Sequence, residues 1–211
     1  SSNNAILRYD DLWLKFSGTA GEATITFTQK ETNFYEATTF SHTFIVARRD
    51  QYGTILIKDA NEWKVFCKLV NEKGMTNLNA RLEADIDLGG DIAMVGNNYA
   101  GTFDGQNHTL KFNWNGGSDS EIAPFKKVSN ATIKNLRTEG TIKSSSYYLS
   151  GLVGDAYGTV NISNCASNVN ITSSHTGGRC DAAGMISYIG GSANITITDC
   201  LVEGNITAMT D

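Results

Sequence analysis

The second half of the chain carries a degenerate repeat, which constrains the fold more than any other feature of the sequence. The run Ile-Lys-Asn-Leu at 133–136 returns as Ile-Ser-Asn-Cys at 162–165 and as Ile-Thr-Asp-Cys at 197–200. A unit of this size cannot bury its apolar face until a neighbouring unit stacks on it. The repeat therefore predicts a solenoid.

Further strand-like runs accompany each copy of the repeat. A second short run follows each copy (140–142, 169–171 and 204–206), and a small, apolar run precedes each copy (123–125, 151–154 and 183–186). Glycine is abundant and proline occurs only at position 124, which is typical of β-structure with many tight corners. We therefore expect three short strands per unit and, for the whole region, a mainly β fold built as a right-handed parallel β-helix.

One position of the repeat alternates between leucine and cysteine. Leu136 in the first copy corresponds to Cys165 and Cys200 in the next two. A position that accepts either residue faces the core, where a thiol behaves as a small hydrophobic group. Neighbouring turns lie roughly 4.8 Å apart, so distance leaves a disulfide between Cys165 and Cys200 open. We expect stacked free thiols, because unpaired cysteine is commonly buried.

The segment at about 59–73 predicts an amphipathic helix. Asp59 and Glu62 are spaced as an N-cap and its partner carboxylate, and Gly74 supplies the C-terminal stop. Apolar residues follow at helical spacing: Trp63, Phe66, Cys67 and Val70. Because an open solenoid end exposes apolar side chains and strand edges, we expect this helix to cap the β-helix.

These patterns divide the chain into two regions. Residues 1–57 hold short strand candidates with alternating polarity, which favour a small β-domain, with a cap on the solenoid as the alternative. Residues 58–211 form the β-helix with its capping helix. The sequence stops just after a repeat, so we expect this β-helix to be truncated at its C-terminus.

The order of the motifs resembles a known family. An Asp-x-x-Glu-Trp helix at 59–72, Asp-Ile-Asp-Leu at 85–88 and Gly-Thr-Phe-Asp-Gly-x-x-His at 101–108 precede the Gly-Leu-Val-Gly and Ile-x-Asn-Cys repeats. Over roughly 55–211 this order resembles the GLUG-motif β-helix domains of adhesin-like surface proteins from gut bacteria. The resemblance implies a cell-surface or secreted protein that serves in adhesion. The third copy departs from the pattern, with Ala-Gly-Met-Ile at 183–186.

Charge and hydropathy argue against several classes of function. The formal net charge of −5 argues against general nucleic-acid binding, which needs a basic surface. No window approaches 18 consecutive apolar residues, so no transmembrane segment is predicted, and any signal or lipid anchor is absent from the given sequence. No cofactor and no metal site are predicted. The run 85–91 matches only part of a calcium-loop pattern.

Four polar residues form the sharpest catalytic candidate: Asp85, Asp87, Asp104 and His108. Asp85 and Asp87 project from the same face of one strand, and Asp104 follows about one coil later. Paired carboxylates on a β-helix serve glycosidases and polysaccharide lyases. Because no lysine or arginine cluster accompanies them, we predict no catalysis here and keep a carbohydrate-active enzyme as the alternative.

Four tyrosines in or beside the inter-strand loops are the predicted binding residues: Tyr147, Tyr148, Tyr157 and Tyr188. Aromatic rings on a flat β-helix face can stack on sugars, and the alternative is that the rings pack against the coil. The sequence therefore predicts a non-enzymatic module that recognises a glycan or a host surface protein. A purely structural spacer is a further alternative, and the oligomeric state stays open.

Overall fold

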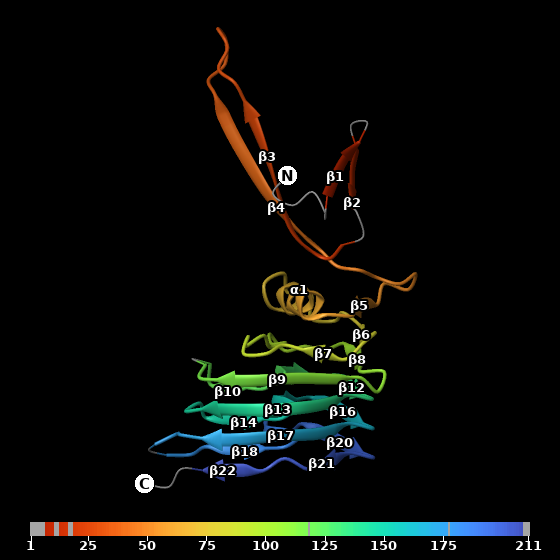
Figure 1. Ribbon diagram of the computed structural model, residues 1–211, viewed down its shortest axis with the longest axis vertical. Coiled ribbons are helices and arrows are strands. Elements are labelled where there is room, and N and C mark those ends of the chain that lie inside the picture. Colours follow the sequence, from red (N-terminus) through yellow and green to blue (C-terminus); the bar gives the residue numbers. More distant parts are fainter. Residues whose placement is uncertain (1–6, 11–12, 17–18, 118, 177, 209–211) are drawn as a thin grey trace. The chain divides into compact units, whose positions relative to one another are not determined.

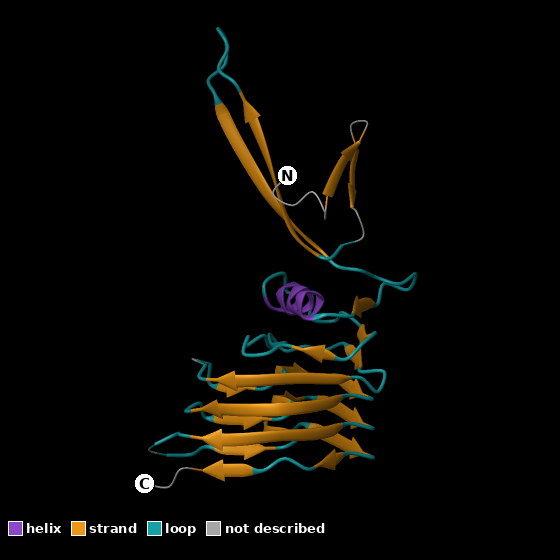
Figure 2. Ribbon diagram, viewed as in Figure 1, coloured by secondary structure: helices purple, strands orange, loops and turns teal. Residues whose placement is uncertain are grey.

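The computed structural model describes residues 7–10, 13–16, 19–117, 119–176 and 178–208. The chain divides into two compact units, Ser1–Arg48 and Arg49–Asp211. The structure is mainly β, with one helix among the described residues (Figure 2). Each unit is described by itself below.

The described residues of the first unit form two pairs of antiparallel strands. Its strands are β1 (Leu7–Asp10), β2 (Trp13–Phe16), β3 (Gly21–Gln29) and β4 (Thr38–Val46), with β1 paired to β2 and β3 paired to β4. Ala23 and Ile25 of β3 are buried against Phe44 and Val46, where the β3–β4 hairpin begins. The far end of the same hairpin is exposed, since Phe27 and Phe40 stack on each other with more than half of their surface in solvent.

The second unit is a parallel β-solenoid of about five turns, as the repeats predict (Figure 1). Its strands stack in register into four parallel sheets. The first sheet contains β5 (Ile55–Ile57), β6 (Ala80–Leu82), β8 (Thr102–Asp104), β12 (Thr132–Lys134), β16 (Thr159–Ser163) and β20 (Asn194–Thr198). The second contains β7 (Ile86–Asp87), β9 (Thr109–Asn115), β13 (Arg137–Ser144), β17 (Ala166–Ser173), β21 (Leu201–Val202) and β22 (Ile206–Ala208).

The two remaining sheets meet at the corner that carries the candidate site. The third contains β10 (Glu121–Ile122), β14 (Tyr148–Ser150) and β18 (Asp181–Ala183), and the fourth contains β11 (Phe125–Ser129), β15 (Val153–Tyr157) and β19 (Ile186–Ile189). A unit therefore has strands in four sheets, and the prediction of three strands was wrong. The run 151–154, taken from sequence as one strand, contains a corner between β14 and β15.

The repeat positions stack as predicted. Ile133, Ile162 and Ile197 are direct neighbours in the first sheet. Cys165 is buried, and all four cysteines, which lie within the described residues, are free thiols. Burial raises the pKa of Cys165 to about 12, as expected for an inert core thiol.

Each repeat turns its corner through a residue with left-handed backbone. Asn135, Asn164 and Asp199 have φ angles of 53°, 51° and 53°. Asparagine and aspartate tolerate this conformation better than other non-glycine residues. This backbone requirement explains why the third repeat position is always Asn or Asp.

Helix α1 (Ala60–Asn71) covers one end of the solenoid core. The Asp59 side chain accepts the Glu62 N–H at 2.9 Å, and Glu62 Oε2 accepts the Lys58 N–H at 2.8 Å. Trp63 and Phe66 are fully buried, with ring centroids 5.7 and 5.9 Å from that of Phe103 in β8. The predicted capping role is therefore confirmed. Within the described ranges, no helix is long and apolar enough to cross a membrane.

The solenoid begins before the predicted boundary at residue 57. Strand β5 pairs in parallel with β6, so 55–57 belongs to the first sheet. The compact units separate between Arg48 and Arg49. A three-residue strand placed before the helix shows no repeat, and its membership in the solenoid depends on a partner 25 residues later in the chain.

Candidate functional site

The predicted catalytic residues Asp85 and His108 lie next to each other. The Asp85 Oδ1 atom accepts the Thr109 N–H at 2.8 Å and lies 3.3 Å from His108 Nδ1. The Thr109 hydrogen bond, together with the nearby His108, lowers the pKa of Asp85, although partial desolvation opposes it. The Asp85 side chain is 74% exposed. It is an ionised carboxylate whose donors hold the neighbouring turn.

Asp87 lies beside Asp85 on a shallow, open depression of about 360 Å³. Its Oδ1 atom accepts the Gly89 N–H at 2.8 Å, and its Oδ2 atom lies 3.7 Å from Lys111 Nζ. The depression is lined by Asp85, Ile86, Asp87, Thr109, Lys111 and Glu139. The two aspartates are therefore brought together as predicted, on an exposed face.

Asp104 is not among the residues that line this depression. It belongs to β8 in the first sheet, where its carboxylate accepts Asn135 Nδ2 at 2.9 Å and the Gln106 N–H at 3.0 Å. Lys134 Nζ lies 3.3 Å away. Burial opposes ionisation of Asp104, but these hydrogen bonds and the lysine outweigh it and lower its pKa. Asp104 thus anchors the Asn135 corner, and the structure does not place it with Asp85 and Asp87 at the depression.

Three of the four predicted binding tyrosines converge. The ring centroids of Tyr148 and Tyr188 are 5.2 Å apart, and those of Tyr157 and Tyr188 are 6.4 Å apart. We call Tyr148, Tyr157 and Tyr188 the tyrosine cluster. Tyr147 lies apart from it, 52% exposed and 4.6 Å from the His175 ring.

The rings of the cluster also pack against the coil. A Cβ atom on Gly190 would lie 2.1 Å from Tyr157 Cε1, so this ring sits directly over the glycine backbone. Lys127 Nζ lies 4.9 Å from the Tyr157 centroid, and Arg179 lies 5.7 Å from that of Tyr188. The rings are therefore anchored by packing, as the alternative interpretation expects, and each remains partly exposed.

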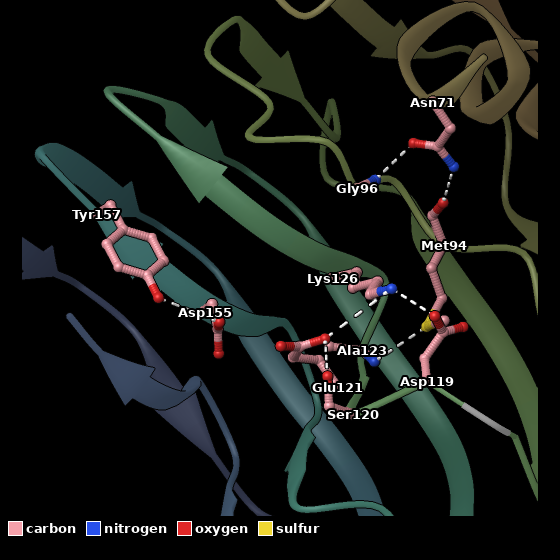
Figure 3. A network of polar contacts seen from close by, with 10 residues as sticks. All are labelled: Asn71, Met94, Gly96, Asp119, Ser120, Glu121, Ala123, Lys126, Asp155 and Tyr157. Carbon is pink, nitrogen blue, oxygen red and sulfur yellow. Dashed lines mark hydrogen bonds and ion pairs between the residues drawn. The ribbon is translucent and has the colours of Figure 1, made fainter.

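A pair of acidic residues that the sequence interpretation missed lies among these tyrosines. Asp155 of β15 is the register neighbour of Lys127 and Tyr188, and Glu121 of β10 is the register neighbour of Tyr148. We call Glu121 and Asp155 the carboxyl pair. Figure 3 shows the pair, with the Tyr157 hydroxyl donating to Asp155 Oδ2 at 3.4 Å.

Asp155 is the only ionisable side chain of this corner that is fully removed from solvent among the described residues, with 4% of its surface exposed. Its Oδ1 atom is buried and has no hydrogen-bond partner in the described part of the chain. Burial is the largest cause that raises the pKa of Asp155, to about 6. The negative charge of Glu121 adds to this increase, and so does the hydrogen bond that a protonated Asp155 makes with Glu121.

Glu121 has partners on its other side. Its Oε2 atom accepts the Ser120 hydroxyl at 2.9 Å and lies 3.9 Å from Lys126 Nζ (Figure 3). Lys126 also forms an ion pair with Asp119. Asp155 is therefore the member of the carboxyl pair whose surroundings favour the protonated form.

One sequence signal pointed to this corner. Asp155 interrupts the apolar run of β15, where a charge on a mostly buried strand requires a compensating partner. The neighbouring carboxyl group, Glu121, lies on a different sheet in the preceding coil. Sequence spacing alone does not bring the two together.

A second concave region follows helix α1. Two adjoining depressions of about 460 and 420 Å³ share Asn71, Ile92 and Met94. Asn71 Nδ2 donates to the Met94 carbonyl and its Oδ1 accepts the Gly96 N–H, both at 2.8 Å (Figure 3). Both polar atoms of the Asn71 amide therefore stabilise the 94–96 loop. In the described ranges, no group of three or more His, Cys, Asp or Glu side chains is arranged to hold a metal ion.

Comparisons of the chain with protein-family models, with curated proteins and with solved structures found no match.

Proposed function

We propose that this chain is a non-enzymatic binding module that recognises a glycan through the tyrosine cluster. The observation that carries the proposal is the convergence of Tyr148, Tyr157 and Tyr188 around the carboxyl pair. Aromatic rings present apolar area to the C–H face of a sugar. The motif resemblance to adhesin-like domains supports a cell-surface or secreted setting for such binding.

The surroundings of the cluster suit a polar ligand. Arg179 forms an ion pair with Asp181, and Lys127 lies over Tyr157, so charged groups of both signs border the rings. The aspartates that the sequence offered as catalytic candidates suit catalysis poorly. Asp85 and Asp104 have lowered pKa values and are ionised near neutral pH, so neither is a good proton donor there.

A glycan array with three proteins tests the proposal: the unmodified chain, Tyr188→Ala and Tyr147→Ala. Tyr188 lies inside the cluster, and Tyr147 is an exposed tyrosine outside it, which makes it the matched control. We expect at least a tenfold loss of affinity for Tyr188→Ala and little change for Tyr147→Ala. Equal losses, or binding to a host matrix protein but to no glycan, contradict the proposal. Absence of all binding favours a structural spacer.

One observation favours a second candidate function, a carbohydrate-active enzyme that uses the carboxyl pair. Asp155 has a raised pKa and lies beside a second carboxyl group, and a carboxyl group with a raised pKa suits a general acid. A glycan depolymerisation screen with Asp155→Asn decides between the two functions, and Asp85→Asn serves as the control. Turnover that Asp155→Asn abolishes and Asp85→Asn retains replaces the binding module with an enzyme.

A further inference from the structure

The carboxyl pair occupies a structural position that glycan binding alone does not explain. Asp155 is buried where β15 packs beside β10, and a Cβ on neighbouring Gly154 would lie 3.0 Å from Glu121 Cβ. The backbone is therefore close enough to press the Glu121 side chain against β15. Two carboxylates in such a place repel each other unless something positive lies between them.

We propose that Asp155 and Glu121 share one proton, and that this proton is a pH-sensitive lock on the corner that carries the tyrosine cluster. The unpartnered Asp155 Oδ1 atom is the site at which the proton resides. A protonated Asp155 donates to Glu121, which satisfies the buried oxygen and removes the repulsion.

The charged and titratable groups around Asp155 agree with a single shared proton. Lys127 of β11 carries the positive charge that lowers the pKa of Asp155, and it lies over the Tyr157 ring. The other facing groups are Glu121 of β10 with Lys126 of β11 beside it, Tyr148 of β14, Tyr157 of β15, Tyr188 of β19, and the Arg179–Asp181 ion pair at β18. Lys126 neutralises Glu121 from outside.

A proton fits this place better than a metal ion. Calcium requires six to eight oxygen ligands, and magnesium requires a nearly ideal octahedron. The pair supplies two carboxyl groups, Asp155 is almost completely covered, and Lys126 already lies beside Glu121. A proton needs only one donor and one acceptor.

The direction of the pH effect follows from the raised pKa of Asp155. The folded chain holds the proton up to a pH of about 6, whereas the unfolded chain releases it near the ordinary value of 3.8. Between these values the folded state binds more protons, so the free energy of unfolding falls as pH rises through this window and levels off above it. The corner is therefore most stable in mildly acidic solution.

Thermal unfolding of the unmodified chain and of Asp155→Asn between pH 4 and pH 8 tests the lock. The amide that this substitution introduces donates to Glu121 at every pH, so the variant keeps the hydrogen bond between positions 155 and 121. We expect the unfolding equilibrium of the unmodified chain to shift toward unfolding, relative to the variant, by up to about a hundredfold between pH 4 and pH 7. A difference that stays constant with pH overturns the proposal.

A second measurement serves if Asp155→Asn does not fold. Carbon-detected NMR of side-chain carboxyl groups in the unmodified chain should show Asp155 titrating near pH 6, and Glu121→Gln should lower that midpoint. Asp155 titration near its ordinary value in the unmodified chain overturns the lock.

The consequence for ligand binding rests on the proposed function and is tested separately. On a glycan that the array identifies, affinity should fall from pH 5 to pH 8 for the unmodified chain and stay level for Asp155→Asn. If no glycan binds, the unfolding and NMR measurements still decide on the lock. If a glycan binds without this pH dependence, the proposed function survives and its coupling to the lock fails.

Discussion

Two sets of acidic residues in the solenoid differ in the hydrogen-bond partners of their carboxyl groups. Asp85 and Asp104 form one set, and the carboxyl pair forms the other. Asp85 and Asp104 accept backbone or amide N–H groups at corners, and both have lowered pKa values. Asp155 lies on a covered strand beside Glu121, has one oxygen without a donor among the described residues, and has a raised pKa. The same residue type is thus a stable anion in one region and a proton-binding group in the other.

The contrast shows that the position of a carboxylate in the coil decides its chemistry. Corners expose N–H groups that no strand uses, and an aspartate there satisfies them. Within a sheet the neighbouring N–H groups are already engaged in the ladder, so an outward carboxylate depends on side chains alone.

Replacing a glycine near each set of carboxyl groups gives the largest expected difference in the free energy of unfolding. A Cβ on Gly154 would lie 2.5 Å from the Lys126 carbonyl oxygen, whereas Gly89, which follows Asp87, has φ +57° and open space around it. We expect Gly154→Ala to lower the free energy of unfolding by about 3 kcal/mol or more, because backbone must move. Gly89→Ala should cost about 1 kcal/mol from its left-handed backbone. Urea unfolding measures the free energy of unfolding of both variants. Equal losses would contradict the close backbone contact at Gly154.

Removing the amide that supports Asp104 should give the next largest effect. Asn135 donates to Asp104 at 2.9 Å, accepts from Asn164 at 2.8 Å, and has a left-handed backbone. We expect Asn135→Ala to cost about 2 kcal/mol, from backbone strain plus the lost hydrogen bonds. Asn135→Gly keeps the backbone and loses only the hydrogen bonds, so it should cost less. If chemical denaturation ranks the glycine variant as the less stable of the two, the backbone argument fails.

Replacing aspartate by asparagine should have opposite signs in the two regions. At pH 7 we expect Asp155→Asn to stabilise the chain by about 1–2 kcal/mol, since an amide donor replaces a buried like charge. Asp85→Asn should destabilise it by about 0.5–1 kcal/mol, a small loss because this carboxylate is well exposed. The lowered pKa of Asp85 means that its contribution is present above about pH 4 and lost as pH falls below that. Differential scanning calorimetry at pH 7 decides, and two changes of the same sign would remove the contrast.

Much of the fold was predictable because it depends on local patterns that recur. The Ile-x-Asn-Cys repeat indicated the solenoid, since inward apolar residues and a left-handed corner are both encoded within four residues. The helix at 59–73 was recognisable from its cap and apolar stripe. The fourth sheet of the coil was missed, because the Gly-Leu corner at 151–152 continues the small and apolar composition of the strands on either side of it.

The candidate site was only partly predictable because it depends on contacts between coils. The tyrosines were identified by type, and their loops of unequal length hid that Tyr147 would lie apart from the rest. Asp85 and Asp87 were identified by alternation on one strand, which fixes their common face. The pairing of Glu121 with Asp155 depends on how β10 and β15 stack, and no pattern within one repeat reports that.

Replacing the lysine beside each set of carboxyl groups should change the free energy of unfolding least. These variants also test the contrast between the carboxyl groups most directly. Lys111 lies 3.7 Å from exposed Asp87, and we expect Lys111→Ala to change the free energy of unfolding by less than about 0.5 kcal/mol, because solvent and salt screen such a pair. Lys127 lowers the pKa of Asp155 against burial and Glu121. Lys127→Ala should therefore raise the NMR titration midpoint of Asp155 above about 6, even where overall stability hardly changes. An unmoved or lowered midpoint would mean that Lys127 serves only to cover the Tyr157 ring, and that burial and Glu121 alone set the proton affinity of the pair.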